Sequence, residues 1–143
     1  MASFTKKQIQ SWTANSPDAF FAWLEDIQPR VPSARGGHAV FVPEPFQRDA
    51  IRDALATDDA GDWRYTTIAF SFPRRHSKTT LMALLVLWRF TTRTTQNIVC
   101  MASNERQSVA TGFALVRQII LNTPTLLAMI GKENVQTFRI VYP

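Results

Sequence analysis

The 143-residue sequence has a single cysteine, Cys100, so no disulfide can form within it. Cys100 and the two histidines, His38 and His76, are too few to build a zinc site from histidine and cysteine ligands. The longest apolar run, residues 81–88, is far short of the roughly 20 residues that cross a bilayer. No apolar signal core follows the two lysines near the N-terminus. We therefore expect a soluble, intracellular protein with no membrane contact.

Acidic residues are scarce in the C-terminal part of the chain. Residues 64–143 carry ten Lys/Arg and only two acids, Glu105 and Glu133, whereas residues 1–63 carry six Lys/Arg and nine Asp/Glu. This basic half favours a polyanionic partner such as DNA, although a nucleotide or an acidic protein would satisfy the same charge. The arginines that are candidates for phosphate contact are Arg74, Arg75, Arg89, Arg93, Arg106 and Arg117.

Residues 65–90 have the pattern of a strand, a phosphate-binding loop and a helix. The first eight residues are rich in β-branched and aromatic types, and residues 79–90 are apolar on nearly every face. Between them, Ser77-Lys78-Thr79 matches the end of the pattern G-x-x-x-x-G-K-[ST], in which the lysine reaches the outer phosphates and the hydroxyl ligates Mg²⁺.

Both glycines of that pattern are missing. Phe72 and Ser77 stand in their places, so a phosphate-binding loop would require Ser77 to adopt a backbone conformation that glycine reaches at lower cost. The alternative is a basic turn between an ordinary strand and an ordinary helix. A solvent-facing position is the simpler interpretation of His76, because one imidazole without a partner does not make a site.

The loop at residues 73–80, Pro-Arg-Arg-His-Ser-Lys-Thr-Thr, resembles the deviant phosphate loop of the large terminase subunit of tailed bacteriophages, the ATPase that packages DNA into the capsid. Upstream, residues 45–49 resemble the adenine-recognition segment of that family, in which a glutamine amide reads the base. Downstream, residues 97–107 resemble the second core strand and the turn that follows it. The resemblance covers roughly residues 42–120.

The resemblance implies ATP and Mg²⁺ as ligands. It assigns Lys78 to the outer phosphates, Thr79 to Mg²⁺, Gln47 to adenine and Arg74 to the γ-phosphate, so that Arg74 and Lys78 are the expected catalytic residues. The full set of expected ATP-binding residues is Gln47, Arg48, Pro73, Arg74, Arg75, His76, Ser77, Lys78, Thr79 and Thr80. The implied partners are double-stranded DNA, a portal protein, a small terminase subunit and further copies of the chain. The implied location is the procapsid portal in the host cytoplasm.

Alternating helix and strand patterns predict an α/β fold, a three-layer sandwich of the P-loop NTPase type with a mainly parallel sheet. The expected strands lie at residues 65–72, near 98–101 and at 137–142. Ser16-Pro17-Asp18 is typical of a helix start, and the following residues place an aromatic stripe on one face. We expect residues 1–44 to form an N-terminal helical segment and connector, and residues 45–143 to form the N-terminal portion of a P-loop ATPase domain.

Hydrolysis by this class of ATPase needs an acidic pair at the end of an apolar strand. Glu105 and Glu133 both follow polar residues, and the acids at residues 25–26 end a segment with helical periodicity. We therefore expect a fold truncated before its acidic-pair strand and incomplete for hydrolysis. The alternatives are a fragment of a helicase-like P-loop ATPase, and a non-catalytic remnant or interaction module whose loop binds an anion loosely.

Overall fold

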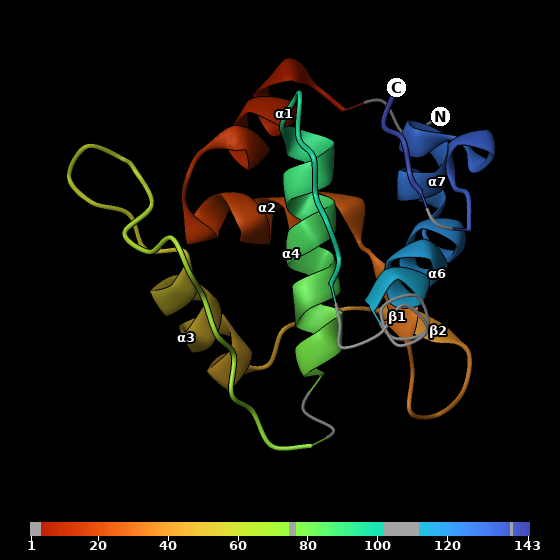
Figure 1. The fold of residues 1–143 in the computed structure, drawn as a ribbon, viewed down its shortest axis with the longest axis horizontal. Coiled ribbons are helices and arrows are strands. Elements are labelled where there is room, and N and C mark those ends of the chain that lie inside the picture. Colours follow the sequence, from red (N-terminus) through yellow and green to blue (C-terminus); the bar gives the residue numbers. More distant parts are fainter. Residues whose placement is uncertain (1–3, 75–76, 102–111, 138) are drawn as a thin grey trace.

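A computed structural model of the chain describes residues 4–74, 77–101, 112–137 and 139–143 (Figure 1). The described part is built mainly from helices: α1 (Lys6–Thr13), α2 (Pro17–Ile27), α3 (Pro45–Ala54), α4 (Lys78–Thr92), α6 (Ala114–Asn122) and α7 (Pro124–Ile130), with a short 3-10 helix at Lys132–Asn134. The two strands are β1 (Arg30–Pro32) and β2 (His38–Val40). Helix α4 is central, and α1, α2 and α6 all contact it (Figure 1).

Helix α2 begins where the sequence predicts. The hydroxyl of Ser16 accepts a hydrogen bond from the N–H of Ala19 at 3.1 Å, and Pro17 takes the first helical position, where its missing N–H costs nothing. Phe20 and Trp23 are fully buried on its inner face. The prediction of a capped helix that packs through aromatic side chains is confirmed.

Helix α1 was not predicted, although its sequence carries a start signal. The hydroxyl of Thr5 accepts from the N–H of Gln8 at 3.3 Å, and the side-chain oxygen of Gln8 accepts from the N–H of Thr5 at 3.0 Å. This reciprocal pair is a capping box, which supplies partners for two N–H groups at the helix start. The Thr-x-x-Gln spacing was therefore the signal available in the sequence.

Three buried tryptophans organise the core around α4. The indole N–H of Trp12 donates to the carboxylate of Asp26 at 2.8 Å, and that of Trp88 donates to the backbone carbonyl of Trp12 at 2.9 Å. Trp23 is also fully buried and stacks on Phe20, with ring centroids 6.2 Å apart. The indoles of Trp12 and Trp88 thus bury their rings while each N–H keeps an acceptor, which removes the cost of an unsatisfied buried donor.

The predicted three-layer sandwich with a mainly parallel sheet is wrong. Within the described residues, the only sheet is an antiparallel hairpin of β1 and β2, in which Val31 lies opposite Ala39. The hairpin falls in residues 29–43, which we expected to be an irregular connector. Its turn places Gly36 and Gly37 at φ values of 89° and 67°, a region that glycine enters without steric cost.

The three segments expected to be core strands do not form a ladder. Residues 65–72 and 96–101 form neither helix nor strand, and the described part of the C-terminal segment contributes only an isolated bridge between Val135 and Ile140. A ladder needs a neighbouring backbone about 4.8 Å away, and β-branched composition alone does not provide one. Instead, one groove separates residues 65–70 from 96–98, and a second separates residues 94–100 from 139–143. Apolar side chains such as Phe70 and Ile140 pack individually against the core.

Candidate phosphate-binding loop

The predicted loop joins the extended residues 65–72 to the N-terminus of α4 (Figure 1). Pro73, Arg74 and Ser77 are all exposed to solvent. Two other predicted site residues, Arg75 and His76, lie outside the described residues. The loop therefore presents its described side chains at one end of the central helix.

Ser77 has the backbone conformation that the sequence pattern requires of it. Its φ and ψ are 55° and 28°, in the left-handed region, and its carbonyl accepts the first helical hydrogen bond of α4 from Leu81 at 2.9 Å. A left-handed residue followed by helical ones turns successive backbone N–H groups to one side, which makes an anion-binding concavity. The N–H groups of Lys78, Thr79 and Thr80 lie in the first helical turn, where no preceding turn offers them a carbonyl.

Lys78 folds back over the loop. Its Nζ atom donates a hydrogen bond to the backbone carbonyl of Phe72 at 3.2 Å, so the ammonium group lies beside the residue that occupies the first glycine position. The side chain remains exposed, and the first turn of α4 contains no acidic residue. The helix dipole also favours anions at this end, so the ammonium group of Lys78 and the dipole would both attract a bound anion.

The other predicted ligands on α4 are the hydroxyls of Thr79 and Thr80. Thr79 is exposed and Thr80 is half-buried, and both belong to the first turn. An exposed threonine hydroxyl next to the lysine fits a Mg²⁺ ligand, since this ion is usually held by few protein groups together with phosphates and water. Within the described residues, no group of three or more His, Cys, Asp or Glu side chains converges on a metal position.

Gln47 lies on α3, whose start approaches the loop. The rings of Phe46 and Phe72 meet edge to face with centroids 5.7 Å apart, which brings residues before the loop against the first turn of α3. Gln47 itself is only 3% exposed, and its side-chain oxygen accepts from the N–H of Glu44 at 2.9 Å. Gln47 therefore also stabilises the start of its own helix, a structural use that the resemblance did not indicate.

Arg48, the other predicted ligand on α3, contacts α2 instead of the loop. Its guanidinium lies over the ring of Phe21, 4.9 Å from the centroid, and Arg52 approaches the same ring at 5.1 Å. Such cation–π contacts stabilise by roughly 0.5–1 kcal/mol at exposed positions. Arg48 therefore has a packing role between two helices that the sequence pattern did not indicate.

Two of the arginines proposed for phosphate contact are used inside the fold. Arg93 donates a hydrogen bond to the side-chain oxygen of Asn15, and the guanidinium of Arg89 lies over the ring of Trp63 at 5.7 Å. Burial and the positive charge of Arg93 lower the pKa of Arg89 from its usual value. Arg75 and Arg106 lie outside the described residues. Among the described residues, the basic side chains of the loop are Arg74 and Lys78.

A scan against protein-family models and searches of curated proteins and of solved structures found no match to this chain. Among the described residues, no helix has the length and apolarity needed to cross a membrane. The assignment of the loop therefore depends on its own residues and geometry.

Proposed function

We propose that this chain is the ATP-binding portion of a DNA-packaging motor ATPase, and that it binds ATP with Mg²⁺ at residues 73–80 and the start of α4. The observation that supports this most directly is the left-handed backbone of Ser77 next to Lys78 and the uncapped helix start. Non-glycine residues in the left-handed region cost about 1–2 kcal/mol. A concavity made by the backbone N–H groups that follow Ser77 gives this conformation a use in binding phosphate.

Each residue has a defined task in this proposal. Lys78 exchanges its contact with the Phe72 carbonyl for the outer phosphates, while the first-turn N–H groups of α4 receive phosphate oxygens. Thr79 offers its hydroxyl to Mg²⁺, which supplies charge neutralisation at the phosphates when bound. Arg74 contacts the γ-phosphate, and Gln47 contacts adenine. The positions of Lys78 and Thr79 on one rigid helix turn would keep their spacing constant between the empty and occupied states.

The wider role comes from the resemblance to the terminase family. In that role, the full-length protein would assemble as a homo-oligomer with a portal protein and a small terminase subunit, and would move double-stranded DNA at the procapsid portal in the host cytoplasm. The second candidate is a non-catalytic module that binds an anion at the same loop. The shortage of acidic residues in residues 64–143 favours it, because hydrolysis requires carboxylates that orient water and hold Mg²⁺.

The test is a thermal-unfolding titration with ATP and Mg²⁺. A ligand that binds only the folded state stabilises it by roughly 2.7 kcal/mol at about 100 times its Kd, so the unfolding midpoint should rise with ATP. Lys78→Ala should abolish the rise. Lys132→Ala, which removes an exposed lysine from the 3-10 helix, is the matched control and should keep it. An equal rise in both variants would contradict the assignment of Lys78.

A further inference from the structure

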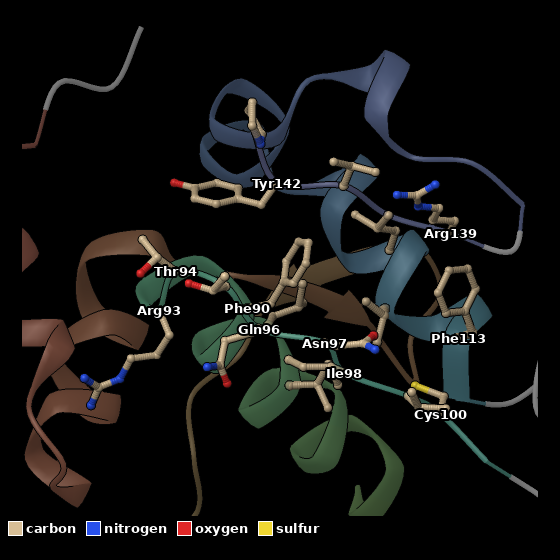
Figure 2. A pocket seen from close by; sticks show the side chains of 18 residues that line it. Phe90, Arg93, Thr94, Gln96, Asn97, Ile98, Cys100, Phe113, Arg139 and Tyr142 are labelled. Carbon is tan, nitrogen blue, oxygen red and sulfur yellow. The ribbon is translucent and has the colours of Figure 1, made fainter.

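A groove of about 780 Å³ lies between residues 94–100 and the C-terminal residues 139–143 (Figure 2). Its floor is apolar and comes from Val86 and Phe90 of α4 and Val116 of α6. The two walls are chain segments outside the helices, and they run on opposite sides of Phe90 in Figure 2. None of the residues that line the groove belongs to the candidate phosphate-binding loop, so a ligand in the groove is independent of the proposed function.

One wall of the groove has a free strand edge. The N–H of Val141 donates to the carbonyl of Asn134 at 3.1 Å, and the N–H of Gln136 donates to the carbonyl of Arg139 at 2.9 Å. In an antiparallel pair, alternate residues direct their N–H and C=O groups to opposite sides. The peptide groups of Ile140 therefore point away from residues 134–136, and Ile140 lines the groove on that side.

The opposite wall is formed by residues 94–100. Among the described residues, no backbone–backbone hydrogen bond joins residues 96–99 to another segment. Val99 is 67% exposed, which is unusual for a valine in a segment of this composition. A strand edge with exposed apolar neighbours is a template for pairing with another chain.

The positive charge of the groove favours polypeptide segments that carry an acidic residue. Among the described residues, the side chains that line it include Arg93 and Arg139 and no Asp or Glu. Arg93 is held by Asn15, whereas Arg139 is exposed and lies at the end of the groove where Cys100 is found (Figure 2). A bound segment with a carboxylate near that end would place it beside Arg139.

We propose that this groove binds an extended segment of a partner protein by strand addition. The backbone of that segment pairs with the free edge at Ile140, and its alternate apolar side chains point to Phe90 and Val116 on the floor. A glutamate or aspartate pairs with Arg139 and sets the direction of the segment. Backbone hydrogen bonds supply affinity in this mode of recognition, and the alternating side chains supply specificity.

The test uses a labelled nonapeptide of alternating valine and threonine with a glutamate near one end, titrated into the 143-residue protein and followed by fluorescence anisotropy. A second peptide carries two adjacent central prolines, which remove a donor from each strand edge, and should bind about tenfold more weakly or worse. Alkylation of Cys100, which lines the groove, should slow when the first peptide is bound. This readout locates the peptide without any substitution.

Arg139→Gln should weaken the glutamate peptide about two- to fivefold, as expected for an exposed ion pair, and leave a glutamine version of the peptide unchanged. Arg35→Gln, a change at an exposed arginine in the β1–β2 turn, is the matched control and should have no effect. Equal binding of the proline peptide, or binding without protection of Cys100, would overturn the proposal. So would sedimentation showing that the protein alone dimerises through this groove while the peptide fails to bind.

Discussion

The indole N–H of Trp23 donates a hydrogen bond to the hydroxyl of Thr91 at 3.1 Å, across 68 residues of sequence. The same hydroxyl donates to the carbonyl of Leu87 at 2.8 Å, so Thr91 accepts from α2 and donates within α4. Trp23 is fully buried and Thr91 is 8% exposed. This contact joins the N-terminal helices to the central helix, at whose start the proposed phosphate-binding loop lies.

Thr91→Val should reduce the free energy of unfolding by about 1–3 kcal/mol, because it leaves the buried indole N–H of Trp23 without an acceptor. Urea denaturation followed by tryptophan fluorescence measures the change. Thr92→Val is the matched control, since the Thr92 hydroxyl donates to the Trp88 carbonyl without serving the indole, and it should cost less. In a Trp23→Phe background, the cost of Thr91→Val should shrink. Equal costs in both backgrounds would show that the two residues are not coupled.

The left-handed conformation of Ser77 predicts opposite tolerance for two small substitutions. Ser77→Gly should keep both stability and ATP binding, because glycine reaches φ values near 55° without steric cost. Ser77→Val should lower the unfolding free energy by about 1–2 kcal/mol and weaken ATP binding, because a β-branched residue is strongly disfavoured in the left-handed conformation. Ser71→Val, at an exposed extended residue, is the control and should be close to neutral. Unchanged ATP binding by Ser77→Val would remove the main support for the loop assignment.

Gln47 allows its structural and ligand-binding roles to be separated. Gln47→Glu retains an oxygen to accept the N–H of Glu44 but loses the amide that reads adenine, and its buried carboxylate should lower the unfolding midpoint. Gln47→Ala loses both and should lower the midpoint as well. Isothermal titration with ATP and with tripolyphosphate measures recognition. Both variants should weaken the binding of ATP more than the binding of tripolyphosphate. The difference in binding free energy should be up to roughly 1–3 kcal/mol. Parallel weakening of the two ligands would make Gln47 purely structural.

Cys100 should react slowly with thiol reagents. Burial raises the pKa of its thiol, so less of the reactive thiolate is present at pH 8 than for a cysteine in the unfolded chain. The pKa of the Cys100 thiol is higher in the folded chain than in the unfolded chain. The contribution of this thiol to the free energy of unfolding is therefore fully present below the ordinary thiol pKa of about 8.5, and it is lost as the pH rises through the pKa of the folded state. Alkylation rates with and without urea check the first point. Cys100→Ser should reduce the loss of stability above pH 8, and an unchanged pH profile would argue against the raised pKa.

The 143-residue chain should not release phosphate from ATP faster than its Lys78→Ala variant. Lys78 and the start of α4 can hold phosphates, but orienting the attacking water requires a carboxylate that the loop does not have. A coupled phosphate-release assay with both proteins measures this. Hydrolysis that depends on Lys78 would identify an overlooked catalytic acid, and Glu105→Gln is the variant to measure first.

Local signals in the sequence determined where most helices begin and end. Ser16 and Pro17 start α2, Thr123 and Pro124 start α7, and Gly131 ends α7 at a φ of 83°. The need for an unusual backbone at Ser77 was also readable, because the pattern around Lys78 demands it whatever the rest of the chain does. These features depend on hydrogen bonds and dihedral preferences within a few residues, so the local sequence carries all the information they require.

Tertiary structure alone decided which segments meet. The composition of residues 65–72 and 96–101 favours strands, yet a strand ladder depends on a second backbone at the right distance, and grooves separate these segments in the folded chain. The partner of Trp23 and the packing of Arg48 on Phe21 follow the same rule. Each is a choice among several partners that the residue type allows, and only the packing of α2, α3 and α4 against one another selects one of them.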